Sequence, residues 1–111
     1  MKTRITELFG VKYPILCGGM FRLAEPKLCA AISNAGGLGN ITAAWYKTEA
    51  EFAAALRETK ELTDRPFWVN VTLLPAMGVG EEQYNMYFDT IASEKIVAVE
   101  ISGTPLSRFA G

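Results

Sequence analysis

Two short stretches carry residues whose types could do chemistry on a flat ligand. Gly18, Gly19 and Met20 directly follow an apolar run that begins at Pro14. Two adjacent glycines leave the backbone bare, so a planar group can approach it closely. Asn70 is a carboxamide within another apolar run, where it needs hydrogen-bond partners or costs a few kcal/mol. We expect Asn70 to be either a satisfied core residue or a residue that points toward a ligand.

General bases are scarce in this sequence, which contains no histidine. This removes the commonest general base and any histidine-based triad or metal site from these residues, and we expect no metal. Carboxylates could substitute, and Glu100 is the best candidate because a strand over 96–102 would place it on one face with Ala98 and Ser102. The alternative is a structural or exposed-edge role, which is commoner for a charged residue on a core strand.

Composition limits the class of protein. The 111 residues are 50% hydrophobic and carry a net charge of −1, which indicates one globular unit with a real core and no basic field for nucleic acid. No apolar run is long enough to span a membrane, and no signal peptide is evident. We therefore expect a cytoplasmic protein in which Cys17 and Cys29 are reduced and serve as buried packing residues.

Hydrophobic patterning predicts alternating strands and helices. Helical spacing of Leu28, Ala31, Ile32 and Ala35 follows Pro26, which suits a first helical position. Two further helices are expected over 49–62 and around 84–91. Strands are expected from Pro14 to Cys17 (fully buried), over 38–43, over 67–74 and over 96–102.

The spacing of the strands predicts a parallel sheet. Their starts recur roughly every 25–30 residues, which accommodates one strand and one helix per step and implies right-handed βαβ units. Two closures fit this pattern: an open doubly wound sheet, or a (β/α)8 barrel of which this chain would supply half. The barrel predicts strands that are neighbours in sequence order, whereas the open sheet predicts a central first strand.

Four stretches, in this order and spacing, carry a resemblance to a known family. They are residues 5–10, 13–20, 31–39 and 66–70, with the run from Ser33 to Gly39 the most specific of them. This pattern closely resembles the N-terminal part of the nitronate monooxygenases, also called 2-nitropropane dioxygenases. The FMN-dependent enoyl-ACP reductases share it. The resemblance favours the barrel: an α/β fold, the N-terminal half of a TIM (β/α)8 barrel with four parallel strands alternating with helices, as a single partial domain over residues 1–111.

The resemblance implies an FMN-dependent oxidoreductase that oxidises alkyl nitronates with O2. It implies that Gly18, Gly19 and Met20 run along the flavin ring and that Asn70 contacts the flavin. The family's catalytic histidine has no counterpart here, so we expect no catalytic residue of that kind in this chain and predict that the isolated chain is inactive. Cys17 and Trp68 depart from the family's usual residues, and Trp68 would share a strand face with Asn70.

Two alternatives stay open beside this interpretation. One is an FMN-dependent enoyl-thioester reductase, which shares the same N-terminal pattern. The other is a non-catalytic fragment that forms homo-oligomers through the open edges of its sheet. For the enzyme, the expected partner is a small-molecule substrate, either a nitronate or an enoyl thioester.

Overall fold

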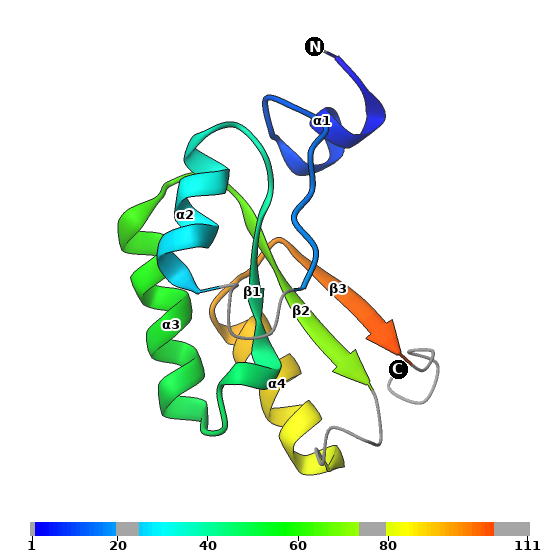
Figure 1. Ribbon diagram of the computed structural model, residues 1–111. Coiled ribbons are helices and arrows are strands. Elements are labelled where there is room, and N and C mark those ends of the chain that lie inside the picture. Colours follow the sequence, from blue (N-terminus) through cyan, green and yellow to red (C-terminus); the bar gives the residue numbers. More distant parts are fainter. Residues whose placement is uncertain (1, 20–24, 74–79, 104–111) are drawn as a thin grey trace.

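Helices and strands alternate along the chain (Figure 1). The computed structural model describes residues 2–19, 25–73 and 80–103. The elements are α1 (Arg4–Phe9), α2 (Pro26–Asn34), β1 (Gly39–Thr42), the 3-10 turn η1 (Ala43–Trp45), α3 (Glu49–Leu62), β2 (Phe67–Leu73), α4 (Glu81–Ser93) and β3 (Ala98–Gly103). The predicted alternation is therefore confirmed. None of the helices in these ranges combines the length and the apolar character that crossing a bilayer requires.

Local signals in the sequence set where the helices begin and end. Pro26 occupies the first turn of α2, where its missing N–H costs nothing. The hydroxyl of Thr48 accepts a hydrogen bond from the Glu51 amide at 3.2 Å and caps α3. After α2 the chain turns at Gly36, whose φ of +105° is disfavoured for residues with a side chain. These features place β1 directly after α2.

The three strands form one parallel sheet in the order β1-β2-β3. In the register, Thr42 of β1 lies opposite Asn70 of β2, and Asn70 lies opposite Glu100 of β3. Strands that follow one another in sequence are thus neighbours in space. The open arrangement with a central first strand is wrong for the described residues.

The main correction concerns the expected strand from Pro14 to Cys17. It is reduced to a single parallel bridge between Leu16 and Leu38, so the sheet has three strands rather than four among residues 2–19, 25–73 and 80–103. It is also not buried, because Ile15 is 63% exposed and Leu16 37% exposed. The pairing ends because the chain beyond Cys17 leaves the edge of β1 and passes over the sheet toward Asn70.

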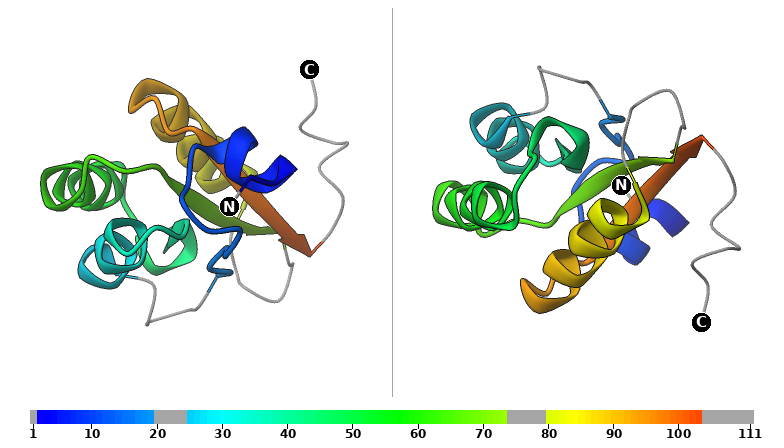
Figure 2. Two further views of the ribbon diagram at one scale, coloured as in Figure 1. Left: turned by 90° about the horizontal axis from the view of Figure 1, so that it is seen from above. Right: turned by 90° about the horizontal axis from the view of Figure 1, so that it is seen from below.

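The apolar core lies between one face of the sheet and the helices α2, α3 and α4, which Figure 2 shows together on that side. Alternate residues of β2 point into it: Phe67, Val69, Val71 and Leu73. Phe52 of α3 meets Tyr87 of α4 edge to face, with ring centroids 5.3 Å apart. The Tyr87 hydroxyl donates a hydrogen bond of 2.6 Å to the Tyr46 carbonyl and ties α4 to the chain after β1.

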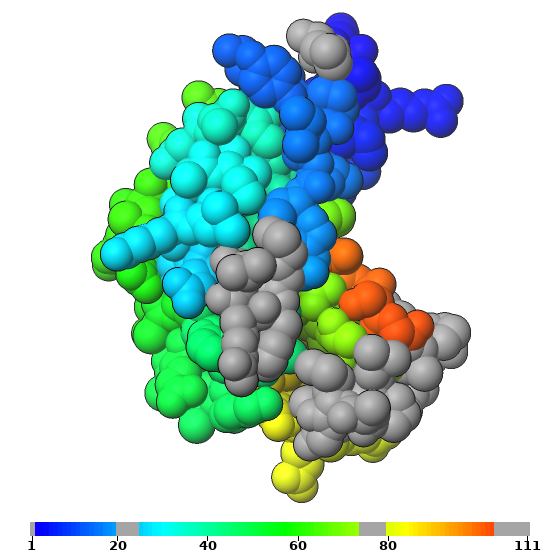
Figure 3. All heavy atoms as spheres, viewed as in Figure 1, coloured from blue at the N-terminus to red at the C-terminus, as the bar shows by residue number. Residues whose placement is uncertain are grey.

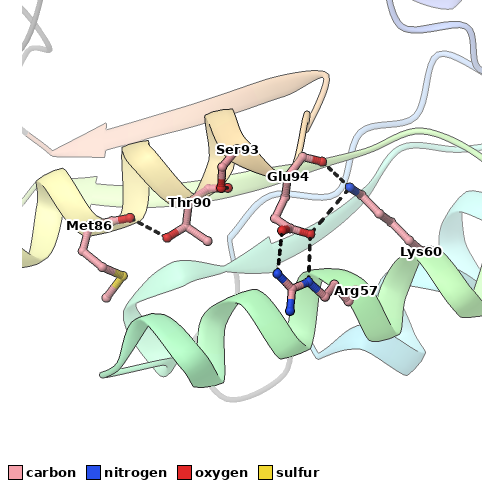
Figure 4. A network of polar contacts seen from close by, with 6 residues as sticks. All are labelled: Arg57, Lys60, Met86, Thr90, Ser93 and Glu94. Carbon is pink, nitrogen blue, oxygen red and sulfur yellow. Dashed lines mark hydrogen bonds and ion pairs between the residues drawn. The ribbon is translucent and has the colours of Figure 1, made fainter.

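Polar contacts join α3 to the end of α4 at the surface (Figure 4). The Glu94 carboxylate accepts two hydrogen bonds from the Arg57 guanidinium, at 3.1 and 3.3 Å. Lys60 bonds the Glu94 carbonyl as well as approaching its carboxylate. Because Arg57 is largely exposed, water screens this pair, and its contribution to stability is small.

Candidate functional site

Seven polar or aromatic side chains lie on the sheet face opposite the helices, which we call the inner face. Strand alternation puts them there, because successive side chains of a strand point to opposite faces. The inner-face residues are Asn40, Thr42, Trp68, Asn70, Thr72, Glu100 and Ser102. The face turned toward the helices is apolar. One side of the sheet therefore packs in the core, and the other side presents polar groups.

Asn70 stands at the centre of the inner face and is only 2% exposed. Its amide nitrogen donates to the Ser102 hydroxyl at 3.2 Å, and its oxygen accepts from the Thr72 hydroxyl at 2.9 Å. Thr72 and Ser102 are themselves 3.0 Å apart. A carboxamide has two donor hydrogens and two acceptor lone pairs. These two bonds fix its orientation and leave one donor and one acceptor position for a further partner.

The two glycines lie over the inner face. A β-carbon built on Gly19 would be 2.5 Å from Cγ of Asn70, and one built on Gly18 would be 3.8 Å from Oε1 of Glu100. Figure 3 views this side of the molecule, with the segment after α1 (blue) running beside the strands β2 and β3. Gly19 therefore lies beside Asn70, and Gly18 lies beside Glu100. Met20, the fourth predicted cofactor residue, lies outside the described residues.

Trp68 closes the end of the inner face where the strands begin. Its indole N–H donates to the Cys17 carbonyl at 2.7 Å, and the Phe9 ring meets it edge to face at 5.6 Å. The expected inward position of Trp68 is thus observed, and its neighbours explain it. The indole braces α1 and the segment that carries the glycines against β2.

The two cysteines differ in their surroundings. Cys29 is fully buried, as expected, and burial raises the pKa of its thiol to about 12. Cys17 is partly exposed, so the prediction of a buried packing residue is wrong there. Partial burial and the nearby Glu100 carboxylate raise the pKa of Cys17. Both thiols are protonated at neutral pH.

Glu100 belongs to the inner face, as its strand position predicted. Its Oε2 accepts a hydrogen bond of 3.2 Å from the Asn40 amide. Asn40 and Thr42 were not predicted as site residues, because their strand is short and contains a glycine. A signal was present: Gly39 and Ile41 alternate with Asn40 and Thr42, which is the pattern of a strand with one polar face.

No group of three or more His, Cys, Asp or Glu side chains in the described ranges is arranged to hold a metal ion. The site is instead built from amides, hydroxyls, one carboxylate and bare glycine backbone. Such a surface suits a flat, polar organic group, which hydrogen-bonding edges and close backbone approach can recognise.

A parallel βα sheet whose polar residues gather toward the carboxyl ends of its strands is the arrangement of α/β enzymes. A family model described as nitronate monooxygenase matches residues 2–106. The chain belongs to the nitronate monooxygenase family.

Curated relatives match the chain over 71 residues, which is 64% of its length. The nitronate monooxygenase of Pseudomonas aeruginosa is 44% identical there. A 5-hydroxy-7a-methyl-1-oxo-octahydro-1H-indene-4-carboxyl-CoA dehydrogenase of Rhodococcus jostii is 46% identical. The matched part amounts to 20% of each of these relatives.

Solved structures share the fold over more of the chain. FabK from Thermotoga maritima superposes with a TM-score of 0.84 at 31% identity and covers 98% of this chain. The nitroalkane oxidase from Streptomyces ansochromogenes gives a TM-score of 0.72 at 25% identity over 89% of this chain. The chain spans about a third of the length of these structures, 33% and 35% respectively.

Proposed function

We propose that this chain forms one wall of the flavin site of an FMN-dependent oxidoreductase that oxidises alkyl nitronates with O2. The observation that carries the proposal is the close approach of Gly19 to Asn70, where a β-carbon would lie 2.5 Å from the amide. Because Gly19 has no side chain, its backbone lies directly against the oriented amide, and bare backbone and amide stand side by side as a flat ring with polar edges requires.

The chain's own residues would hold and orient the flavin. Gly18, Gly19 and Met20 would lie along the ring, and Asn70 would hydrogen-bond to it. Membership of the nitronate monooxygenase family supports these roles, as does the pairing of Asn70 with Ser102, which presets the amide. When bound, the flavin would accept the electrons removed from the substrate, because redox chemistry of this kind belongs to the cofactor.

The same proposal extends to the whole protein. The three parallel strands and the bridge at Leu16 would be the N-terminal half of a (β/α)8 barrel, with the inner face turned toward the barrel interior. We place the protein in the cytoplasm, with a small molecule as its partner. Sequential strand order supports the barrel because a doubly wound sheet reverses its order at a central strand.

A second candidate is reduction of an enoyl thioester. The carboxyl-CoA dehydrogenases among the relatives favour it, because a carboxyl-CoA is a thioester. The two candidates share the flavin site and differ in substrate. Oxygen uptake with ethylnitronate supports the first, whereas oxidation of a nicotinamide cofactor that requires an enoyl thioester supports the second.

The test of the flavin site is Asn70→Ala in the full-length protein. Loss of the amide removes a hydrogen-bond partner of the ring, and we expect the flavin-to-protein ratio after gel filtration to fall several-fold. Asn85→Ala is the matched control because Asn85 is an exposed asparagine on α4. Flavin content that is equal in both variants would contradict the role of Asn70.

A further inference from the structure

Trp68 is the bulkiest side chain of the inner-face set, and the flavin-site proposal gives it no task. It belongs to β2 and precedes Asn70 by two positions, so both side chains lie on the same face of the strand. Its register partner on β3 is Ala98, whose short side chain leaves room for an indole on that side. A large ring thus lies next to the oriented amide of Asn70 along the strand.

The indole uses its only hydrogen-bond donor on the segment that carries the glycines. An indole ring has a single polar group, its N–H. In Trp68 this group donates to the carbonyl oxygen of Cys17 at 2.7 Å, across 51 positions of the sequence. A distance at the short end of the N–H···O range indicates a well-formed bond. The chain just before Gly18 is therefore tied to β2.

Cys17 is held from two sides. Its amide donates to the Leu38 carbonyl at 2.9 Å, and its own carbonyl accepts the bond from Trp68. That carbonyl belongs to the planar peptide unit that includes the nitrogen of Gly18, so fixing it fixes the plane from which the two glycines start. Glycine has more backbone freedom than any other residue. An anchor immediately before the pair therefore restricts how far Gly18 and Gly19 can move from the inner face.

The first helix holds the indole in turn. Phe9, the last residue of α1, meets the Trp68 ring edge to face, with centroids 5.6 Å apart and an angle of 73° between the planes. Aromatic pairs of this geometry stabilise each other beyond the area that they bury. α1 is itself capped by Thr3, whose hydroxyl accepts from the Thr6 amide at 3.1 Å. A chain of contacts therefore runs from α1 through Phe9 and Trp68 to Cys17.

We propose that Trp68 is a positioning residue that keeps Gly18 and Gly19 against the inner face before a ligand arrives. It acts through its N–H on Cys17, while Phe9 holds the ring. The role rests on the proposed function of the same site, because the ligand concerned is the flavin. A segment that already has its bound position loses less conformational freedom on binding, so the affinity for the ligand rises. Trp68 needs no contact with the flavin to act in this way.

A purely packing role makes a different prediction. Loss of a ring that only fills space would lower the free energy of unfolding and leave the affinity of the folded protein for FMN unchanged. Trp68→Phe separates the two roles, because phenylalanine keeps an aromatic ring at this position and lacks the N–H. Trp45→Phe is the matched control: Trp45, the other tryptophan of the sequence, belongs to η1 and lies beside α3.

The experiment measures FMN binding and amide exchange on the full-length protein after removal of its flavin. We expect the FMN dissociation constant to rise about three- to ten-fold in Trp68→Phe, as loss of one neutral hydrogen bond implies. In the same variant the Cys17 amide should exchange with deuterium several-fold faster, while the amides of α3 keep their wild-type rates. Trp45→Phe should match the wild type in both measurements.

A second variant tests the contact with α1. Phe9→Leu leaves the indole N–H in place but removes the ring that holds it, and we expect the FMN dissociation constant to rise about two- to three-fold. The double variant should bind FMN no more weakly than Trp68→Phe, because both changes act through one hydrogen bond and are therefore not additive. Additive losses of affinity would show that Phe9 acts by another route.

Each outcome decides the assignment. A wild-type FMN dissociation constant or wild-type exchange of the Cys17 amide in Trp68→Phe would overturn it. If Trp68→Phe does not fold, Phe9→Leu replaces it, and wild-type affinity and exchange in that variant would contradict the role. If the wild-type protein binds no FMN, the proposed flavin site fails and amide exchange alone decides: faster Cys17 exchange in Trp68→Phe leaves the anchoring of the glycines standing, and equal exchange refutes it.

Discussion

The contact between Gly19 and Asn70 is the most demanding detail at the scale of single residues. In Gly19→Ala the new methyl group would lie 2.5 Å from Cγ of Asn70, so the amide or the glycine backbone must shift, and the Asn70 side chain that bonds Ser102 is disturbed. We expect several-fold lower flavin content in the full-length protein, measured by flavin absorbance against protein concentration. Gly80→Ala is the control, because a β-carbon at Gly80 meets no atom within 4 Å. Equal flavin content in the two variants would refute the steric argument.

The buried thiol of Cys29 gives a pH-dependent prediction. Its pKa is about 12 in the folded chain, against an ordinary value of 9.0. Below pH 9 the thiol is protonated in both the folded and the unfolded states, and it adds no pH dependence. Between pH 9 and 12 the unfolded state loses the proton and the folded state keeps it, so the free energy of unfolding falls as pH rises. Urea titrations across this range should show a smaller decline for Cys29→Ala than for the wild type; equal declines would contradict this.

Site residues could be predicted from the sequence where their chemistry conflicted with their surroundings. Asn70 and Glu100 are polar residues within apolar strands, and adjacent glycines at a strand end indicate that something approaches the backbone closely. Asn40 could not be found in this way because its strand is short and contains few apolar residues from which a polar side chain would differ. The bond between Asn40 and Glu100 joins residues 60 positions apart, and no local pattern encodes it.

At the scale of elements, the packing of α2 against β1 depends on Gly39. A β-carbon there would clash with the Cys29 carbonyl group, whose carbon would be 2.9 Å away. Both partners are backbone, so neither can turn aside, and overpacking of this kind costs about 1–3 kcal/mol. We expect Gly39→Ala to lower the free energy of unfolding by that amount in urea titrations. A decrease in the free energy of unfolding below about 0.5 kcal/mol, the range of ordinary surface substitutions, would contradict this, because it would mean that α2 can move away from β1 at little cost.

The same close approach explains an error about which side of α2 is buried. The pattern of Leu28 and Ala31 predicted the buried side, but Leu28 is 38% exposed. The small residues Cys29, Ala30 and Ser33 are buried instead, because only they let the helix axis come this near to the strand. Ser33 also donates to the Pro66 carbonyl and accepts from the Gly39 amide. Side-chain size and tertiary hydrogen bonds outweighed hydrophobic periodicity here.

At the scale of the whole molecule, the described sheet has two open edges. One is β3, and the other is the segment bridged through Leu16, beside which Ile15 is 63% exposed. Unpaired strand edges with apolar neighbours promote association. We expect the isolated 111-residue chain to elute well above its mass of 12.1 kDa in light scattering coupled to gel filtration. A strictly monomeric chain would contradict this.

The alternation along β2 has a consequence for how such a protein can diversify. Phe67, Val69, Val71 and Leu73 maintain the contact with the core side of the sheet, while Trp68, Asn70 and Thr72 between them lie on the inner face, where we propose that the ligand binds. Substitutions at Asn70 and Thr72 leave the contacts of β2 with α3 and α4 intact, so the ligand-facing side can vary, or be screened in a library of these two positions, while the core stays constant. Selection thus acts on the two faces of one strand nearly independently, for folding on the core face and for chemistry on the inner face.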